Sequence, residues 1–507
     1  MLGKPGKLGT VAWLIFWGGL STTWCWTAAQ AIGPTFDEPF YIQGGLKNWH
    51  DLSHRELLTQ GTMPLPTEVQ TLPLAVAEFF GAEPQADLSI WLPIARRTNV
   101  VFWWLLLWAS YRLTVIYGGT TAGCLAVALV ACEPVLLGHA SLATTDVAFS
   151  ACLLALMAVF RARREMVTWQ QRLLWPAVWC MLTVLAKASA LLFVPLCLTA
   201  IELERLWIGG WRPSFSMAAR RPLLRSLRDL ALIGLLGFAL VLIVCPRASR
   251  GLLFQIRHNL DGHGGSFLLG ETHPIGYWYY FPATLAIKLG VPLFILQAVL
   301  LAARPRYFLN GATLAALVAL AATPTFRVQV GVRLVLPIAV LAIVGAAAAF
   351  ARLWSEQEIR WRRILCGGFM ATLVVWSVSN ASLVWPHGIC YTNELFGRTA
   401  QGYLALNDSN FDWGQGLNEL AAWQRKHPEA PLIVRYFGTD PSLPRLPMQA
   451  IATLDLLSPA ETYRGNYLAV STNYCGIRAL AEKLGTPCAR TMTYLIYDFR
   501  VGSSAIE

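Results

Sequence analysis

Charged residues are scarce in this chain: Asp, Glu, Lys and Arg together make up 14% of its 507 residues. Soluble domains carry roughly 25% charged residues, whereas 55% of the residues here are hydrophobic. This composition excludes an ordinary soluble protein and predicts an α-helical polytopic membrane protein. The 21 tryptophans and 15 tyrosines agree with this, because their rings favour the two membrane interfaces.

Sequence signals of other protein classes are missing. The 11 cysteines form no CxxC pair, and the spacing of His258, His263 and His273 fits no standard ligand pattern. We therefore predict no metal site and no cofactor, and a divalent ion is not indicated. No segment resembles a nucleotide-binding loop, which favours a lipid-linked sugar over a nucleotide sugar. No internal repeat is present, although a transporter built from duplicated halves would show one.

The net charge of +11 raises the question of nucleic-acid binding, but the arrangement of the charges argues against it. Arginines and lysines cluster in short loops between apolar runs, which is the positive-inside pattern of membrane proteins. A membrane crossing needs roughly 17 to 25 apolar residues. We predict 11 spans, near residues 9–30, 98–117, 120–137, 145–162, 172–187, 189–207, 229–246, 284–303, 309–324, 331–351 and 364–385.

The first run follows Lys4 and Lys7 and resembles a signal peptide. Its length, together with Trp24 and Trp26 near its end, favours an uncleaved span. With the N-terminus inside, the arginine-rich loops alternate consistently. We predict a bacterial inner-membrane protein with a cytoplasmic N-terminus, whose outer, periplasmic parts are residues 31–97, 138–146, 247–283, 325–330 and 386–507.

Two domains are predicted. Residues 1–385 form the transmembrane module, with amphipathic helices in its outer loops. Residues 386–507 form a small outer α/β domain, because WGQGLNELAAWQRKH reads as helix whereas PLIVRYFG, NYLAVST and MTYLIYDF read as strands. A disulfide between Cys475 and Cys488 is compatible with an outer location.

Ionisable residues gather at the predicted outer membrane edge. Asp37 and Glu38 lie in FDEPFY after the first span, and Asp146 follows the threonines of ATTD. Charged groups at membrane depth usually face a cavity or a partner, although basic side chains also reach toward head groups and acids near span ends are solvated. Acids beside a nucleophile and cations beside a phosphate suit a transferase that acts on a lipid phosphate.

The motifs resemble, in order, those of GT-C glycosyltransferases. The matching segments are FDEPFY, LLGHASLATTD, LAKASALLFVPL, FLLGETHPIGYWYYFPATLAIKLGVPL, RVQVGVRLVLP and YTNELFGRTAQGYLALNDSNFDWGQGLNEL. They span residues 30–440 and are most similar to bacterial relatives of protein O-mannosyltransferases and lipid A aminoarabinose transferases (glycosyltransferase family 39-like).

The resemblance implies an inverting membrane enzyme that takes a sugar from a polyprenyl-phosphate donor. Asp37 matches the general base, Glu38 its neighbour and Asp146 the second acid. Relatives carry a lysine where this chain has Thr67, so other cations are expected to bind the donor phosphate. The candidates are Lys288, Arg333, Arg257, His258 and Arg327.

Substrate-binding candidates lie in the outer loops and in the tail segment NDSNFDWGQG. They are Tyr41, His139, Glu271, Tyr279, Asp412 and Trp413. Asp412 is alternatively a helix N-cap. The expected partners are the lipid-linked donor, membrane lipids and an acceptor that is a protein, a lipid or a glycan.

Three alternatives stay open at the level of sequence. A transporter or flippase of lipid-linked sugars would also place charges in spans. A non-catalytic subunit would keep the fold without the activity. A lipid-linked oligosaccharide polymerase or ligase would share the apolar plan, but would be expected to rely on an arginine-rich outer loop rather than on an acidic pair.

Overall fold

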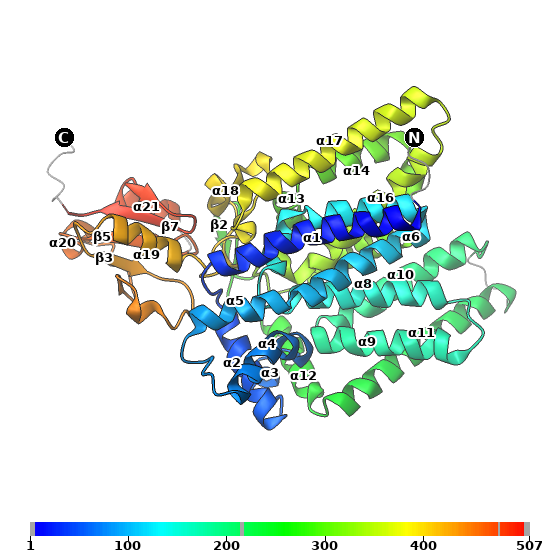
Figure 1. The fold of residues 1–507 in the computed structure, drawn as a ribbon, viewed down its shortest axis with the longest axis horizontal. Helices are drawn as coiled ribbons and strands as arrows, with labels where there is room; N and C mark the ends of the chain where they lie inside the picture. The colour runs from blue at the N-terminus through cyan, green and yellow to red at the C-terminus, as the bar shows by residue number, and fades with distance from the viewer. Residues whose placement is uncertain (1–5, 213–216, 475–476, 501–507) are drawn as a thin grey trace.

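The computed structural model of the protein describes residues 6–212, 217–474 and 477–500. Long helices run side by side through most of the molecule, and a small sheet lies at one end (Figure 1). The start of α1, the turn between α16 and α17 and the end of α10 lie at the opposite end (Figure 1). The helical body therefore has two distinct ends.

The long helices of the body are α1 (Lys7–Ala31), α6 (Val100–Ala131), α8 (Asp146–Arg163), α9 (Trp175–Ala186), α10 (Ala190–Ile208), α11 (Met217–Val244), α14 (Val291–Ala303), α15 (Gly311–Ala322), α16 (Leu336–Ser355) and α17 (Arg360–Val384). The centre of the helical body consists of α6, α8 and α16, each of which packs against the other two. α8 and α16 are apolar on nearly all sides, as expected of helices surrounded by other helices.

Shorter elements lie toward the sheet end of the body. They are α2 (Glu38–Asp51), α3 (Arg55–Thr59), α4 (Pro64–Phe79), α5 (Leu88–Thr98), α7 (Pro134–Ala140), α12 (Ala248–Asp261), α13 (Tyr280–Lys288) and the hairpin of β1 (Ser266–Leu268) and β2 (Glu271–His273). α2, α4 and α5 pack against one another, and together they cover the end of α1 at which the candidate site begins.

Residues after α17 form a five-stranded sheet in the order β4-β3-β5-β7-β6. Its elements are α18 (Arg398–Gln401), α19 (Leu417–Lys426), β3 (Leu432–Arg435), β4 (Gln449–Ala450), α20 (Pro459–Thr462), β5 (Tyr467–Ser471), α21 (Ile477–Leu484), β6 (Ala489–Arg490) and β7 (Tyr494–Asp498). β3 is parallel to β4 and β5, whereas β7 is antiparallel to β5 and β6. Leu420 of α19 packs on one face of the sheet and Leu480 of α21 on the other.

Four stretches within the described residues are long and apolar enough to cross a membrane: Leu88–Ala131, Arg220–Val244, Val332–Ser355 and Arg360–Val384. A fifth crossing results if α13 and α14 count as one span. The number of 11 spans therefore stays a prediction. Several predicted spans correspond to helices shorter than a full crossing, such as α9 and α15.

Two predicted span boundaries differ from the structure. The runs 98–117 and 120–137 share one long helix, α6, which breaks at Gly119, where φ is 77°. The run 284–303 is divided into α13 and α14, which meet at a bend of 107°. The bend has a local cause: Pro292 lacks an N–H and its ring clashes with the carbonyl four residues earlier, at Lys288, where α13 ends.

Candidate active site

Asp37 lies at the turn between α1 and α2, directly before the first residue of α2. Its carboxylate accepts hydrogen bonds from the Arg333 guanidinium at 2.8 Å and from the Tyr41 hydroxyl at 3.3 Å. Tyr41 comes four residues later, so the two side chains share one face of the helix. The Asp37 side chain is 24% exposed, so a substrate can reach it.

Glu38, the next residue, has a different environment. Its side chain is fully buried and forms an ion pair with the buried guanidinium of Arg96, whose Nε and second amino nitrogen donate at 2.7 and 2.6 Å. The backbone N–H groups of Thr35 and Ala143 also donate to Glu38, each at 2.8 Å. Burial alone would raise the pKa of Glu38, but the charge and hydrogen bonds of Arg96 hold it below its usual value. Glu38 is therefore an ionised structural anchor.

Arg96 also binds the end of α1. Its guanidinium donates to the backbone carbonyls of Ala29, Ile32 and Gly33 at 2.7 to 2.9 Å. These carbonyls lie at the end of α1, where helix carbonyls have no partner within the helix. The Glu38–Arg96 pair thus joins α1, α2, α5 and the loop before α8, and it holds the turn that carries Asp37.

Asp146, the second predicted acid, is the buried first residue of α8. Its Oδ1 pairs with Nζ of Lys187. Lys187 lies between α9 and α10, where the backbone is extended (φ −164°, ψ 140°). Because α8 packs against both of these helices, the break presents the ammonium to the start of α8.

Arg333 lies in the 3-10 turn Val332–Val335 that precedes α16. Besides Asp37, it contacts the indole of Trp413, with its guanidinium carbon 4.2 Å from the ring centre. Trp413 is buried and belongs to the segment between α17 and the sheet. The charges of Asp37, Asp146 and Asp408 all act on this guanidinium, so Arg333 is the electrostatic centre of the site.

His139 of α7 completes the site. Its ring meets that of Trp413 edge to face, with centroids 6.5 Å apart. Burial, opposed by Asp146 but reinforced by nearby cations, lowers the pKa of His139 to about 3. The imidazole is therefore neutral near pH 7. We call these residues the Arg333 cluster: Asp37, Tyr41, His139, Asp146, Lys187, Arg333 and Trp413.

The cluster contains buried polar atoms without hydrogen-bond partners among the described residues. They are Oδ2 of Asp146, Nδ1 of His139 and Nε of Arg333. Buried polar groups are nearly always hydrogen-bonded, so such atoms need an explanation. Oδ2 of Asp146 and Nδ1 of His139 lie within electrostatic reach of Arg333, so both atoms are available to a bound substrate.

The sequence predictions for this site omitted Lys187. A signal was present, since a lysine inside the apolar run LAKASALLFVPL is expected to face a partner. What the sequence could not provide was the pairing, because Asp146 and Lys187 are 41 positions apart.

Two predicted site residues are engaged elsewhere. Lys288, 1% exposed, donates to the carbonyls of Ile389 and Asn410 at 2.5 and 2.6 Å. Asp412 is buried and accepts hydrogen bonds from the Ser471 hydroxyl at 2.5 Å and from the Gly414 N–H at 3.0 Å. It does not cap a helix, since α19 begins at Leu417. Both side chains bind groups of the tail segment, although the charge of Lys288 also acts on His139 of the Arg333 cluster.

The remaining predicted residues lie in exposed segments around α12 and the β1–β2 hairpin. Arg257 is exposed on α12, Glu271 is exposed on β2 and Tyr279 is 38% exposed. Arg327 donates to the Leu260 carbonyl at 2.9 Å, near the end of α12. The ring of His258 packs between those of Phe254 and His263. Among the described residues, no hydrogen bond, ion pair or ring contact joins these side chains to a member of the Arg333 cluster.

His263 nevertheless connects this region to the cluster. Burial and the charge of Arg333 lower the pKa of His263, whereas the charge of Asp37 raises it. The loop after α12 therefore lies within electrostatic reach of the cluster. Within the described residues, no group of three or more His, Cys, Asp or Glu side chains could hold a metal ion. Cys475, proposed to pair with Cys488, lies outside those residues.

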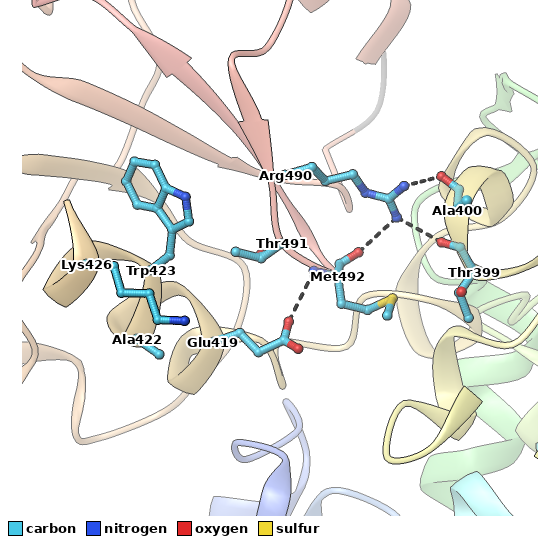
Figure 2. A pocket seen from close by; sticks show the side chains of 9 residues that line it. All are labelled: Thr399, Ala400, Glu419, Ala422, Trp423, Lys426, Arg490, Thr491 and Met492. Carbon is cyan, nitrogen blue, oxygen red and sulfur yellow. Dashed lines mark hydrogen bonds between the residues drawn. The ribbon is translucent and has the colours of Figure 1, made fainter. Parts of the chain in front are cut away.

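A separate cavity of about 520 Å³ lies beside the sheet, lined by α18, α19 and the residues around β6 (Figure 2). Two of its charged side chains make internal contacts, whereas Nε of Arg490 and Oγ1 of Thr491 have no hydrogen-bond partner among the described residues. Arg490 donates to the carbonyls of Thr399, Ala400 and Met492, and Glu419 accepts from the Met492 N–H at 3.1 Å (Figure 2). These contacts join the sheet to α18, and no cluster residue lines the cavity. We therefore regard it as a junction between elements.

Comparisons with solved structures identify the fold. The oligosaccharyltransferase AglB from Archaeoglobus fulgidus, in complex with an inhibitory peptide and a dolichol-phosphate, is 12% identical with a TM-score of 0.53 and covers 94% of this chain and 71% of its own. Its apo form gives 10% identity and a TM-score of 0.52, over 92% and 70% of the two chains. The chain has the fold of the GT-C glycosyltransferases, which confirms the prediction from its motifs.

A third structure is similar over more of both chains. ArnT from Cupriavidus metallidurans bound to undecaprenyl phosphate is 15% identical, with 97% of this chain and 98% of that chain covered and a TM-score of 0.47. The fold assignment rests on AglB, whose TM-score is higher. No known protein family matches the sequence, and no curated protein matches it.

Proposed function

We propose that this protein transfers a sugar, with inversion, from a polyprenyl-phosphate donor to an acceptor hydroxyl or amine. The observation that carries the proposal is the pairing of Asp37 with Arg333 at 2.8 Å, beside a second acid–cation pair, Asp146–Lys187. Such a site supplies a carboxylate base and cations for a phosphate leaving group. The GT-C fold, which AglB shares, supports the same class of reaction.

Asp37 is the proposed base. The acceptor heteroatom attacks the anomeric carbon, the bond from that carbon to the phosphate oxygen breaks, and the electron pair leaves with the polyprenyl phosphate. The acceptor proton passes to Asp37. Inverting sugar transfer uses a carboxylate in this way, and the partly exposed side chain of Asp37 suits access by an acceptor.

Arg333 is the proposed main phosphate ligand. Guanidinium groups match phosphate oxygens through paired hydrogen bonds, and Nε of Arg333 has no partner among the described residues. A phosphate that binds Arg333 competes with Asp37 for its guanidinium. Donor binding would therefore loosen the ion pair and free the carboxylate to accept a proton.

Lys187 replaces Lys288 in the proposed donor site. Its ammonium pairs with Asp146, which also acts on Arg333, whereas that of Lys288 is taken by two backbone carbonyls. Asp146 would position Lys187 and offer its free Oδ2 to a donor hydroxyl. Tyr41, His139 and Trp413 form the proposed sugar-binding surface, and the exposed Arg257 and Arg327 belong to its outer rim.

We further propose that the cluster faces the periplasm of a bacterial inner membrane. The support is the charge distribution: the arginine-rich loops, expected inside, are those that join the far ends of the helices. Glu38 has no proposed part in the chemistry, because its oxygens are occupied by Arg96 and two backbone N–H groups.

Asp37→Asn tests the proposal. The full chain is reconstituted in vesicles with labelled polyprenyl-phosphate sugars and candidate acceptors, and released polyprenyl phosphate is measured together with glycosylated product. The variant is expected to lose about 100-fold or more in rate, the usual contribution of a general base, with an unchanged thermal midpoint. Asp261→Asn, an exposed acid at the end of α12, is the matched control.

An Asp37→Asn rate within threefold of wild type, an order-of-magnitude criterion well below a base's usual contribution, would remove Asp37 as the base. The same vesicles address the flippase alternative, since movement of intact donor across the bilayer without release of polyprenyl phosphate would contradict the transferase proposal.

A further inference from the structure

A second charged site lies at the other end of the helical body. A cavity of about 900 Å³ opens between the end of α10 and the start of α11, far from the sheet (Figure 1). Its charged lining consists of five arginines and one glutamate: Arg164, Arg205, Arg212, Arg221, Arg225 and Glu165. No residue of the Arg333 cluster takes part, so the cavity is independent of the proposed chemistry.

The deep arginines of this cavity are neutralised by buried acids. Arg164 donates to Glu202 at 2.9 to 3.0 Å and to Asp229 at 2.8 Å. Glu202 also accepts hydrogen bonds from Arg205 and from the Ser226 hydroxyl. These acids are therefore fully engaged, and they cannot balance further positive charge at the cavity mouth.

The arginines at the cavity mouth are not neutralised by acids in this way. Arg221 and Arg225 are exposed and have no ion-pair or hydrogen-bond partner among the described residues. They are four residues apart on α11 and so lie on one helix face, where like charges repel each other. Arg212 donates to the carbonyls of Trp207 and Trp211 and stacks on the Trp207 ring at 4.3 Å, but it meets no carboxylate there. The cavity mouth carries a clear excess of positive charge.

Its surroundings indicate the depth at which this charge lies. Trp207 is 55% exposed, at the point where the apolar α10 ends, and exposed tryptophans favour the level of lipid head groups. Basic pockets between membrane helices bind the phosphates of anionic lipids. Arginine suits this role because its fork of donors matches phosphate oxygens.

We propose that this cavity binds the phosphodiester head group of an anionic membrane phospholipid. Arg221 and Arg225 would supply the main contacts, and Arg212 would close the site beside Trp207. The lipid would offset the repulsion between the two arginines and would tie the start of α11 to the end of α10.

The test uses the purified full chain in detergent, titrated with phosphatidylglycerol or with phosphatidylcholine of the same acyl chains. Bound lipid is counted by native mass spectrometry, and the thermal midpoint is followed in parallel. We expect wild type to prefer phosphatidylglycerol by about tenfold or more, as two basic residues near an anionic head group allow. Arg221→Gln/Arg225→Gln should abolish this preference.

The matched control is Arg360→Gln/Arg363→Gln, which removes the same charge from exposed positions at the start of α17 and should keep the preference. Arg221→Lys/Arg225→Lys keeps the charge but lacks the forked guanidinium donors, so it should lose part of the preference for phosphatidylglycerol. This variant supplies a second readout if the glutamine variant folds poorly. Retained preference in both test variants, or an equal loss in the control, would overturn the proposal. Competition by inorganic phosphate as strong as that by the lipid would also overturn it, in favour of a free-phosphate site.

Discussion

Asp37 and Glu38 are neighbours in the chain, yet their carboxylates do different work. Consecutive residues at the start of a helix point in different directions, so Asp37 faces Arg333 and Glu38 faces Arg96. The first pair is partly exposed, whereas the second has no exposed side-chain surface. Substitutions at these two positions should therefore fail in different ways.

Glu38→Gln is expected to lower stability. Removing one partner of a buried ion pair leaves an uncompensated charge, here on Arg96, and costs about 3–5 kcal/mol. We expect a clear fall in the thermal midpoint of the purified chain, with activity lost in proportion to the folded fraction. The control is Glu56→Gln, which breaks the partly exposed Lys47–Glu56 pair and should cost less than about 1 kcal/mol. A Glu38→Gln protein as stable as wild type would show that the pair is not an anchor.

At the scale of residues, the sequence marks positions through motifs, but it cannot show which distant side chains pair with them. FDEPFY and ATTD drew attention to Asp37 and Asp146, and both carboxylates act on Arg333 in the structure. The sequence could not separate Glu38 from Asp37, because its partner Arg96 lies 58 positions away. It also could not reveal that Lys288 is occupied by backbone carbonyls.

At the scale of elements, the turn before α16 positions the central arginine. Gly331 has φ 152°, and a Cβ atom there would lie 2.2 Å from Oγ of Ser409. Next to it, the Val332 N–H donates to Asn410 at 2.8 Å. The tail segment thus packs directly on the turn that carries Arg333, and only a glycine fits between them.

Gly331→Ala should therefore disturb both stability and activity. We expect a cost of about 1–3 kcal/mol from overpacking and a loss in transfer rate of about 10- to 100-fold, since small displacements of a catalytic group are costly. Gly81→Ala is the control, because Gly81 also has a left-handed φ, 88°, but nothing lies within 4 Å of its Cβ position. If both variants lost transfer activity equally, the turn at Gly331 would not be what positions Arg333.

A second element contact joins the tail segment to the sheet through Asp412. Burial raises the pKa of Asp412 to about 6 from its usual 3.8. The folded state therefore holds the proton of Asp412 more tightly than the unfolded state, so the contribution of this group to the free energy of unfolding is highest below pH 4. It falls as the pH rises from about 4 to 6, by about 3 kcal/mol for one such group.

Asp412→Asn should remove this loss and raise stability at pH 7.5. Asp408, whose pKa burial likewise raises to about 6, keeps the same sign of dependence, so part of the slope should survive. Hydrogen exchange of the β5 amides, corrected for the intrinsic rate, measures the effect because Ser471 of β5 donates to Asp412. A steeper loss of protection between pH 4 and 6 in the variant would contradict it.

Elements were predictable from apolar runs, but their breaks were not. The apolar run 284–303, interrupted by Lys288, was predicted as one span, although Pro292 accounts for the break after Lys288. The bend of 107° between α13 and α14 has no signal in the sequence. The strand-like stretches of the tail contain β3, β5 and β7, because short apolar runs rich in β-branched and aromatic residues mark strands. The pairing order of the sheet, with its parallel and antiparallel parts, has no comparable local signal.

At the scale of the whole molecule, the order of motifs predicted the GT-C fold at sequence identities of 10 to 12%. The orientation in the membrane rests on charge alone. The arginine-rich loops and the sheet lie at opposite ends of the body (Figure 1), so a single labelling experiment decides between the two orientations.

Two exposed positions provide matched probes of this orientation. Leu457 lies in the tail and is 91% exposed, and Val167 follows α8 near the arginine-rich end and is 92% exposed. A membrane-impermeant maleimide added to intact spheroplasts should label Leu457→Cys but not Val167→Cys, since positive loops stay inside. After permeabilisation both should be labelled, which controls for accessibility. Mass spectrometry of the labelled peptides separates them from the natural cysteines, and labelling of Val167→Cys alone would invert the orientation and move the Arg333 cluster to the cytoplasmic face.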